Sequence, residues 1–223
     1  MTPTDPPRYR VHPSPVGDIL IVAVDDALVT LHPFDGPLDS ELESVALRLR
    51  ALPVPDEADA AAPGSPASPS PIDEAARQLD EYFDGERREF QLPLDWRLVR
   101  GFTRAALEAV VEIPYGETAG YGEIAIAAGS PRAARAVGTA CATTPFSVIV
   151  PVHRVVRADG SLGEYGGRPE VKRFLVDLEQ GLAVPAAPDG AAAPDAGADR
   201  ASGSAPAPST ASPGAGARQA AGV

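Results

Sequence analysis

The chain has 223 residues, a length that suits one or two small domains. Its single cysteine, Cys141, excludes an internal disulfide and a zinc site built from several cysteines. No apolar run approaches the roughly 18 residues of a membrane span, and the start lacks the basic and apolar regions of a signal peptide. We therefore expect a cytoplasmic protein without membrane contact.

The net charge of −12 is unevenly distributed along the chain. Residues 1–97 hold 8 arginines, no lysine and 19 acidic residues, whereas residues 98–183 hold 9 basic and 9 acidic residues. Acidic flanks weaken nonspecific binding to phosphates and make it sensitive to salt. A nucleic-acid surface is therefore expected only in the middle section, where it suits the recognition of one local feature.

The first predicted elements are strands and a helix. Residues 17–31 contain two β-rich runs around Asp25-Asp26, a pattern that predicts a hairpin. Residues 41–52 then place Leu42, Val45 and Leu49 at helical spacing.

Low-complexity sequence separates and follows the structured parts. Residues 53–72, rich in Pro, Ala, Ser and Asp, are expected to form a flexible insertion, and residues 184–223 a disordered tail. Between them, residues 73–84 predict a second helix with Asp73 as its N-cap, and a short strand is expected near Phe90–Leu92.

The middle section predicts a pair of short helices. A helix over 102–113 ends at Pro114-Tyr115-Gly116, and short helices are expected over 121–128 and 132–142. The turn Gly129-Ser130-Pro131 joins the last two, with Ser130 as N-cap and Pro131 as the first helical residue. Two short helices joined by a turn that contains glycine are typical of a helix-turn-helix.

A dense series of motifs occupies residues 102–180: FTRAAL, IPYGET, GYGEIA, PRAARAVG, VPVHRVV, GSLGEYGG and KRFL. Together they resemble the C-terminal domain of the O6-alkylguanine-DNA alkyltransferases, and residues 73–95 resemble the end of that family's N-terminal domain. The resemblance implies an α/β fold. A small N-terminal sheet-plus-helix domain (1–97) would precede a mostly helical C-terminal domain (98–183) with a DNA-binding helix-turn-helix.

Val152 departs from the family at its defining residue. The family motif is Pro-Cys-His-Arg-Val, and its cysteine accepts the alkyl group, whereas residue 152 here is valine. A side chain without a nucleophile cannot accept an alkyl group. His153 and Glu179 match the histidine that deprotonates the cysteine through water and the glutamate that orients this histidine. Without the nucleophile we interpret both as structural.

The residues that turn a nucleotide out of the duplex are retained. Arg135 matches the arginine that enters from the minor groove and fills the gap left by the base, a role that suits a planar cation. Arg132 lies in the same motif and is assigned to DNA binding. Tyr121 matches the tyrosine that crowds the target phosphate. Flipping is needed because the O6 atom of guanine is inaccessible in stacked DNA. The alternative interpretations are that Arg135 is an ordinary surface arginine and that Tyr121 is an ordinary packing residue.

The base pocket is expected around Tyr165, which matches the pocket tyrosine, and along the backbone from Val155 to Gly167, which matches the loop that reads the base edge. Gly163, Gly166 and Gly167 permit close backbone approach.

Three further positions depart from the family pattern. Thr144 replaces an asparagine before Pro145, Gly166 replaces a common serine and so removes a donor toward O6, and Arg168 replaces a glycine and narrows the pocket mouth.

These features favour a non-catalytic protein, similar to the alkyltransferase-like proteins, that recognises O6-alkylguanine in double-stranded DNA. Such a protein passes the lesion to nucleotide excision repair proteins; we expect a monomer without metal or organic cofactor. Two alternatives remain: a methyltransferase that uses Cys141, which aligns with a residue lining the family's pocket, and a degenerate interaction module without DNA binding.

Overall fold

The structure, a computed structural model, describes residues 5–56 and 69–182. The expected tail (184–223) and most of the expected insertion (57–68) lie outside the described residues. Within the described ranges, no helix is long and apolar enough to cross a membrane, and no group of His, Cys, Asp and Glu side chains is placed to hold a metal ion.

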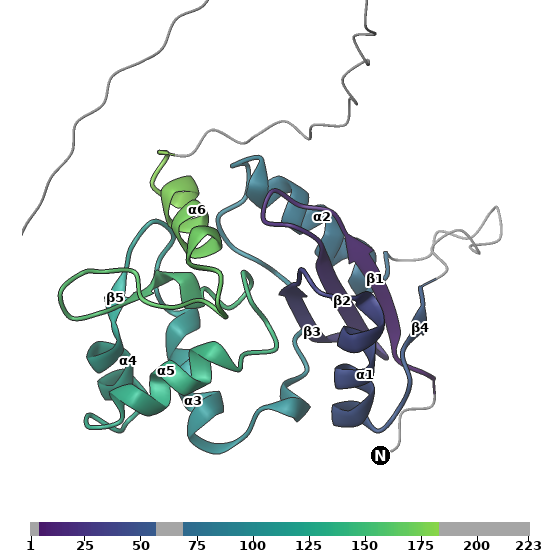
Figure 1. The fold of residues 1–223 in the computed structure, drawn as a ribbon, viewed down its shortest axis with the longest axis horizontal. Coiled ribbons are helices and arrows are strands. Elements are labelled where there is room, and N and C mark those ends of the chain that lie inside the picture. The colour runs from purple at the N-terminus through teal and green to yellow at the C-terminus, as the bar shows by residue number, and fades with distance from the viewer. Residues whose placement is uncertain (1–4, 57–68, 183–223) are drawn as a thin grey trace, which may run out of the picture. The chain divides into compact units, whose positions relative to one another are not determined.

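A four-stranded sheet forms the N-terminal part (Figure 1). Its strands are β1 (Arg8–His12), β2 (Ile19–Val24), β3 (Ala27–Pro33) and β4 (Val54–Pro55), in the order β3-β2-β1-β4. Strand β4 is parallel to β1, and the other pairs are antiparallel. The predicted hairpin is confirmed as β2–β3, with Asp25 in the left-handed region at the turn. Strand β1 was not predicted, because arginines alternate along it.

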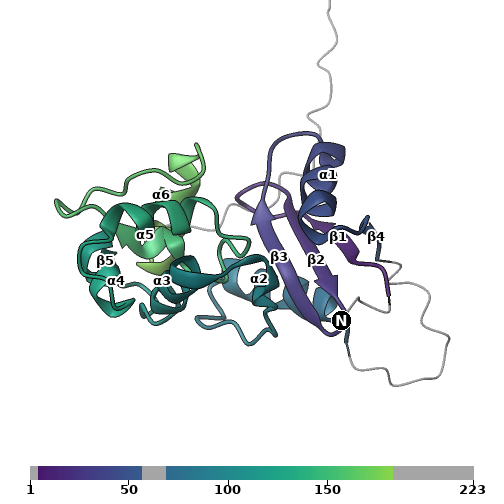
Figure 2. The ribbon, with the colours of Figure 1, turned by 90° about the horizontal axis from the view of Figure 1, so that it is seen from below.

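Strand β2 is buried on both faces, which explains its continuous apolar sequence. Ile19 and Ile21 belong to the core that contains α2 (Pro71–Phe83), whereas Leu20 and Val22 pack in a second cluster with Val45 of α1 (Leu38–Leu49). Successive side chains of a strand point to opposite faces. The two helices therefore cover opposite faces of the sheet (Figure 2).

Helix α2 begins earlier than predicted, and Asp73 is not its N-cap. The N-cap is Ser70, whose hydroxyl accepts a bond from the Asp73 backbone N–H at 3.1 Å, while the Asp73 carboxylate accepts from the Ser70 N–H at 3.2 Å. This reciprocal capping box satisfies two N–H groups that the helix leaves unpaired. Strand β4 and the start of α2 show that the bounds 53–72 for the insertion are wrong at both ends.

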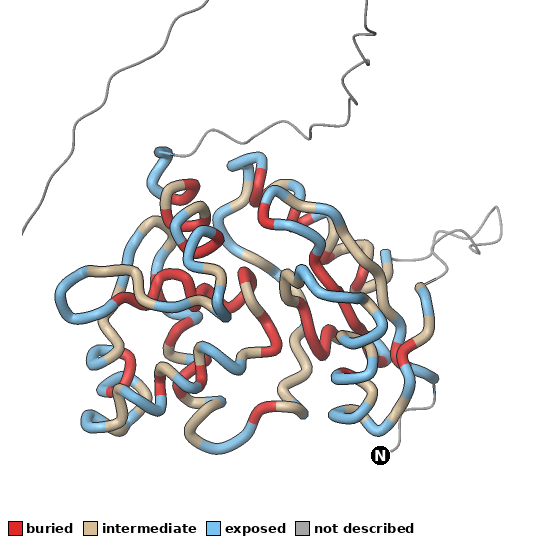
Figure 3. The backbone as a smooth tube through the Cα atoms, viewed as in Figure 1, coloured by how far each residue is buried: buried red, intermediate tan, exposed pale blue. Residues whose placement is uncertain are grey.

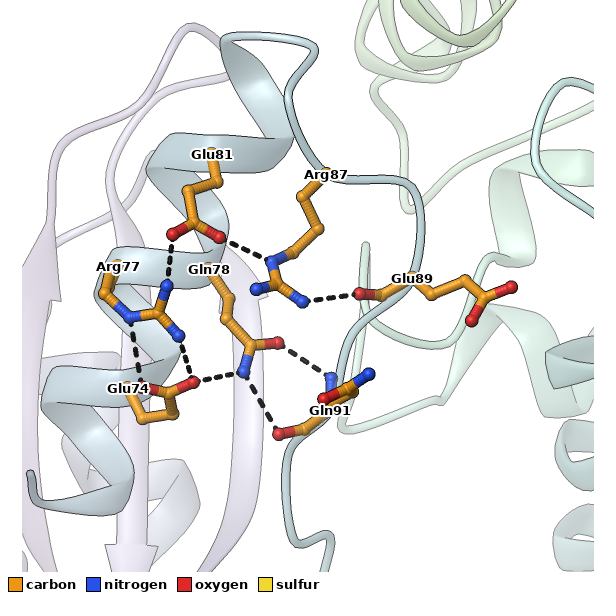
Figure 4. Close-up of polar contacts among 7 residues, drawn as sticks. All are labelled: Glu74, Arg77, Gln78, Glu81, Arg87, Glu89 and Gln91. Atoms are coloured by element: carbon orange, nitrogen blue, oxygen red, sulfur yellow. Dashed lines mark hydrogen bonds and ion pairs between the residues drawn. The ribbon is translucent and has the colours of Figure 1, made fainter. Parts of the chain in front are cut away.

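The strand expected near Phe90–Leu92 does not form. The buried side chain of Gln78 on α2 takes the place of a neighbouring strand: its amide donates to the Gln91 carbonyl at 3.1 Å and accepts from the Gln91 N–H at 2.8 Å. Arg87 also binds Glu81 of α2 at 2.7 Å (Figure 4). Side chains of α2 therefore hold this segment.

The C-terminal part is mostly helical. Its elements are η1 (Trp96–Leu98), α3 (Gly101–Val111), β5 (Ala119–Gly120), α4 (Tyr121–Ala127), α5 (Ala134–Ala142), η2 (Val152–Arg154), β6 (Val155–Val156) and α6 (Pro169–Glu179), where η marks a 3₁₀ turn. Helices α4 and α5 pack together and against α3, as a helix-turn-helix predicts. Short parallel strands β5 and β6 join the start of α4 to η2.

The expected cap of α5 is wrong. The helix begins at Ala134 after Ala133, which provides no side-chain cap. Ser130 instead belongs to the turn: its N–H donates to the Ala125 carbonyl at 2.8 Å, and its carbonyl accepts from Ala133 at 2.9 Å.

One main core joins the two parts of the fold. Figure 3 shows buried residues in both parts. It combines buried residues of β2, β3 and α2 with residues of α3, α5 and α6. The Pro145 carbonyl accepts from the Leu31 N–H at 2.7 Å and from the Thr30 hydroxyl at 2.9 Å. The sheet therefore fixes the start of the segment that leads to Val152.

Candidate functional site

A cavity of about 290 Å³ lies where α4, α5, η2 and the loop before α6 meet. It is lined by Pro33, Tyr121, Gly138, Cys141, Ala142, Ser147, Val152, Arg157, Gly163, Glu164, Tyr165, Gly166 and Arg168. Motifs that are far apart in the sequence thus contribute to one cavity, including the predicted residues Tyr121, Cys141, Val152, Tyr165 and Gly166. Apolar walls with a few polar groups are typical of a small-ligand site.

Three residues assigned to the base pocket lie outside this lining. Val155 lies in β6, and its carbonyl accepts a hydrogen bond from the Lys172 ammonium at 2.5 Å. Thr144 lines a neighbouring depression, and its hydroxyl accepts from the Phe146 N–H at 3.2 Å. Gly167 has a φ of +83° but does not line the cavity. Of the residues named for the base pocket, Gly163, Tyr165 and Gly166 line this cavity.

Val152 is buried in the cavity wall, with 4 % of its surface exposed. It opens the 3₁₀ turn η2, and its N–H donates to the Val150 carbonyl at 2.7 Å. Cys141 lines the same cavity from α5. Burial raises the pKa of the Cys141 thiol to about 11, although Lys172 lowers it. At neutral pH the thiol is therefore protonated, and a thiol is a much weaker nucleophile than a thiolate.

Beside Val152, Glu179 is at the centre of a buried hydrogen-bond network. One carboxylate oxygen accepts from the Tyr82 hydroxyl at 2.7 Å and from His153 Nε2 at 2.8 Å. Arg154 donates to both oxygens, at 2.8 and 2.9 Å, and the Gly116 N–H donates at 3.1 Å. Burial alone would raise the pKa of Glu179. The hydrogen bonds from His153 and Arg154 have the larger opposite effect and lower this pKa to about 2.

The same network determines the tautomer of His153. An ionised carboxylate only accepts hydrogen bonds, so Nε2 carries the proton and Nδ1 is left as an acceptor. His153 is completely buried, which lowers its pKa, and the ring is therefore neutral. Nδ1 is buried without a hydrogen-bond partner among the described residues. The ring next to Val152 thus offers one unused basic nitrogen.

Tyr121 and Tyr165 contribute aromatic surface to the cavity. Tyr121 is the first residue of α4, and a Cβ at Gly163 would lie 3.5 Å from its hydroxyl, an ordinary van der Waals contact, so the loop packs against Tyr121. Gly163 also has a φ of +63°. The Tyr165 hydroxyl is buried, which raises its pKa, and it makes no hydrogen bond of good geometry to any described residue, although Ser147 and the Val148 backbone lie near it.

Arg132 and Arg135 are exposed on the helix-turn-helix. Arg132 lies in the turn before α5, and Arg135 is in the first turn of that helix. Within residues 5–56 and 69–182, neither side chain forms an ion pair. Both cations are therefore available to an external anion.

The sequence reasoning missed several residues of the site. Arg157, Ser147 and Glu164 line the cavity, and Arg154 and Tyr82 hold Glu179. Arg154 lies in the VPVHRVV motif, which could have identified it. No local pattern indicates the contact of Tyr82, because it lies 97 positions before Glu179 in the sequence.

Comparison with known proteins identifies the class of this fold. Residues 8–96 match the model of the 6-O-methylguanine DNA methyltransferase ribonuclease-like domain, and residues 101–181 match that of the same family's DNA binding domain. The methylated-DNA–protein-cysteine methyltransferase of Mycobacterium tuberculosis is 38 % identical over 176 residues, which cover 79 % of this chain and 94 % of the relative. That of Mycobacterium leprae is 49 % identical over 107 residues, 48 % of this chain and 64 % of the relative.

Solved structures agree. The crystal structure of Mycobacterium tuberculosis O6-methylguanine methyltransferase aligns with a TM-score of 0.62 and 36 % identity, over 80 % of this chain and 95 % of that one. A structure of the Mycobacterium tuberculosis protein in complex with DNA aligns with a TM-score of 0.62 and 37 % identity, over 80 % of this chain and 96 % of that one. The chain belongs to the 6-O-methylguanine DNA methyltransferase family, and the predicted two-part α/β fold is confirmed.

Proposed function

We propose that this protein recognises O6-alkylguanine in duplex DNA and does not itself remove the alkyl group. The observation that carries the proposal is Val152, which stands in the VPVHRVV motif where the family motif has its acceptor cysteine and is buried in the wall of the cavity. A valine side chain can contact an alkyl group through dispersion, but it offers no lone pair to attack it.

Duplex DNA is proposed as the ligand because the helix-turn-helix presents two exposed cations, Arg132 and Arg135, which form no ion pair with any residue that the structure describes. In this proposal Arg135 enters the duplex and replaces the extruded base, Arg132 contacts a phosphate, and Tyr121 crowds the phosphate of the target nucleotide. A related structure that contains DNA supports this ligand. The flipped base would then stack on Tyr165 in the cavity.

The alternative of a methyltransferase that uses Cys141 has one observation in its favour, since Cys141 and Val152 line the same cavity. The raised pKa of about 11 weighs against it. At pH 7 such a thiol is ionised only in about one molecule in 10⁴, which leaves almost no nucleophile.

The proposal extends to the fate of the lesion. A protein that holds the flipped base without reacting would mark the site for nucleotide excision repair proteins. We also propose that it acts as a monomer in the cytoplasm, which native mass measurement and cell fractionation test.

Binding to two matched duplexes tests the proposal. We expect a duplex with one O6-methylguanine to bind at least about tenfold more tightly than the same duplex with guanine, as measured by fluorescence anisotropy at fixed salt. Arg135→Ala is expected to weaken lesion binding by about fivefold or more, because a contact of this kind contributes about 1–3 kcal/mol. Arg48→Ala, which removes an exposed arginine of α1, is the control and leaves binding unchanged.

Two results would contradict the proposal. Equal binding to both duplexes would indicate the degenerate interaction module. A mass gain of about 14 Da on Cys141 after incubation with the lesion would indicate the relocated methyltransferase.

A further inference from the structure

Arg168 anchors the cavity to the N-terminal part of the protein. It precedes α6 and lines the cavity, and its Nη2 donates to the Val16 carbonyl at 2.7 Å. Gly17, the next residue, has a φ of +95°, and a Cβ there would lie only 3.2 Å from Nη2. The glycine therefore permits this close approach, and the guanidinium is held in position at the cavity wall.

Most donors of this guanidinium remain unused. Arginine carries five N–H donors, and the bond to Val16 is the one hydrogen bond that the described residues give it. The nearest carboxylates, of Asp35 and Glu170, lie 4.0 and 3.7 Å from Nε and are mostly exposed, so both pairs are weak. Nη1 is buried without a partner in the described part of the chain. A positioned cation with spare donors is suited to bind an anion.

The rest of the lining favours an anion with an apolar stem. Arg157 adds a second positive charge, whereas Glu164 supplies one exposed negative charge. Val152 and Cys141 provide apolar surface in the same wall. The lining itself thus carries two cations against one carboxylate, while the carboxylates of Asp35 and Glu170 lie outside the lining and are mostly exposed to screening solvent.

We propose that Arg168 makes the cavity selective for O6-alkyl groups that end in a carboxylate, such as carboxymethyl. This inference rests on the proposed function, because the cavity must first receive a flipped base. The planar guanidinium can donate to both oxygens of a carboxylate, whereas a methyl group leaves its donors unused. A DNA phosphate is the other anion within reach of an arginine near a duplex; a phosphate contact would be the same in every duplex, whereas a carboxylate contact depends on the alkyl group.

Four duplexes that differ at one base test the inference: O6-carboxymethylguanine, O6-carbamoylmethylguanine, O6-methylguanine and guanine. The carbamoylmethyl group has the shape of the carboxymethyl group without its charge. We expect the carboxymethyl duplex to bind about tenfold more tightly than the carbamoylmethyl duplex. Arg168→Met is expected to abolish this preference and to retain binding of O6-methylguanine. Arg173→Met, which removes an exposed arginine of α6 outside the cavity, is expected to preserve the preference.

The outcomes separate this inference from the proposed function. Equal binding of the carboxymethyl and carbamoylmethyl duplexes, both tighter than guanine, overturns the inference and leaves the proposed function standing. The same loss for all four duplexes in Arg168→Met assigns the residue to a DNA phosphate and also overturns it. No preference for any lesion over guanine overturns the proposed function itself. Arg168→Lys keeps the charge but not the planar fork, so a partial preference in this variant supports the inference if Arg168→Met fails to fold.

Discussion

Glu179→Gln is expected to lower the free energy of unfolding by about 3–5 kcal/mol, because it leaves a buried arginine without its counter-charge. Arg154 is only 7 % exposed and donates to both oxygens of Glu179. A glutamine keeps the size of the side chain, but its amide offers one acceptor oxygen and adds donors that face the N–H groups of Arg154. Urea denaturation followed by circular dichroism measures the difference.

Tyr82→Phe is the matched control for this network. It removes one hydrogen bond to Glu179 and keeps the carboxylate, so the expected loss is about 1 kcal/mol. A loss for Glu179→Gln no larger than that for Tyr82→Phe would contradict the assignment of a buried ion pair at the centre of the fold.

The contribution of Glu179 should also depend on pH. Its pKa is lowered from 4.5 to about 2 in the folded protein, so the unfolded chain takes up the proton first as the pH falls. The stabilisation is therefore complete above about pH 4.5 and is lost as the pH falls toward 2. The difference between the wild type and Glu179→Gln is expected to shrink over this range.

Local sequence patterns predicted those secondary-structure elements that short-range interactions determine. The β2–β3 hairpin and the helices α4 and α5 follow from short-range periodicity and turn residues, and all of them are present. The strand predicted near Phe90–Leu92 does not form, because the backbone of Gln91 is hydrogen-bonded to the side chain of Gln78. No strand pattern in the sequence indicates such a pairing.

The candidate site also contains residues that the sequence identified and contacts that only the fold creates. The family resemblance singled out Tyr121, Tyr165 and Val152, which line one cavity. The sequence could not supply the contact of Arg168 with Val16, because the two residues are 152 positions apart and the fold alone brings them together. Likewise, the raised pKa of Cys141 arises from burial, which depends on packing across several elements.

Val152→Cys is expected to create a thiol that accepts a methyl group from O6-methylguanine DNA, detected as a mass gain of about 14 Da that the wild type does not show. The residue next to it, His153, is neutral, and its Nδ1 is unpaired in the described structure and free to take the thiol proton through a water molecule. Glu179 holds the ring through Nε2. The remaining parts of a cysteine-activating relay are therefore in place.

The rate of this transfer tests how much the other departures matter. We expect Val152→Cys to react more slowly than the Mycobacterium tuberculosis relative, because Gly166 provides no hydroxyl and the large, charged side chain of Arg168 lines the cavity. Combining Val152→Cys with Cys141→Ala keeps a single thiol, so the methyl group must then lie on residue 152. Adding His153→Gln should abolish the transfer, since glutamine supplies no base. Transfer at the relative's rate would show that Val152 alone separates this chain from a repair enzyme, whereas an unmodified Val152→Cys that still binds the lesion would show that the cavity holds the base in a geometry unsuited to attack.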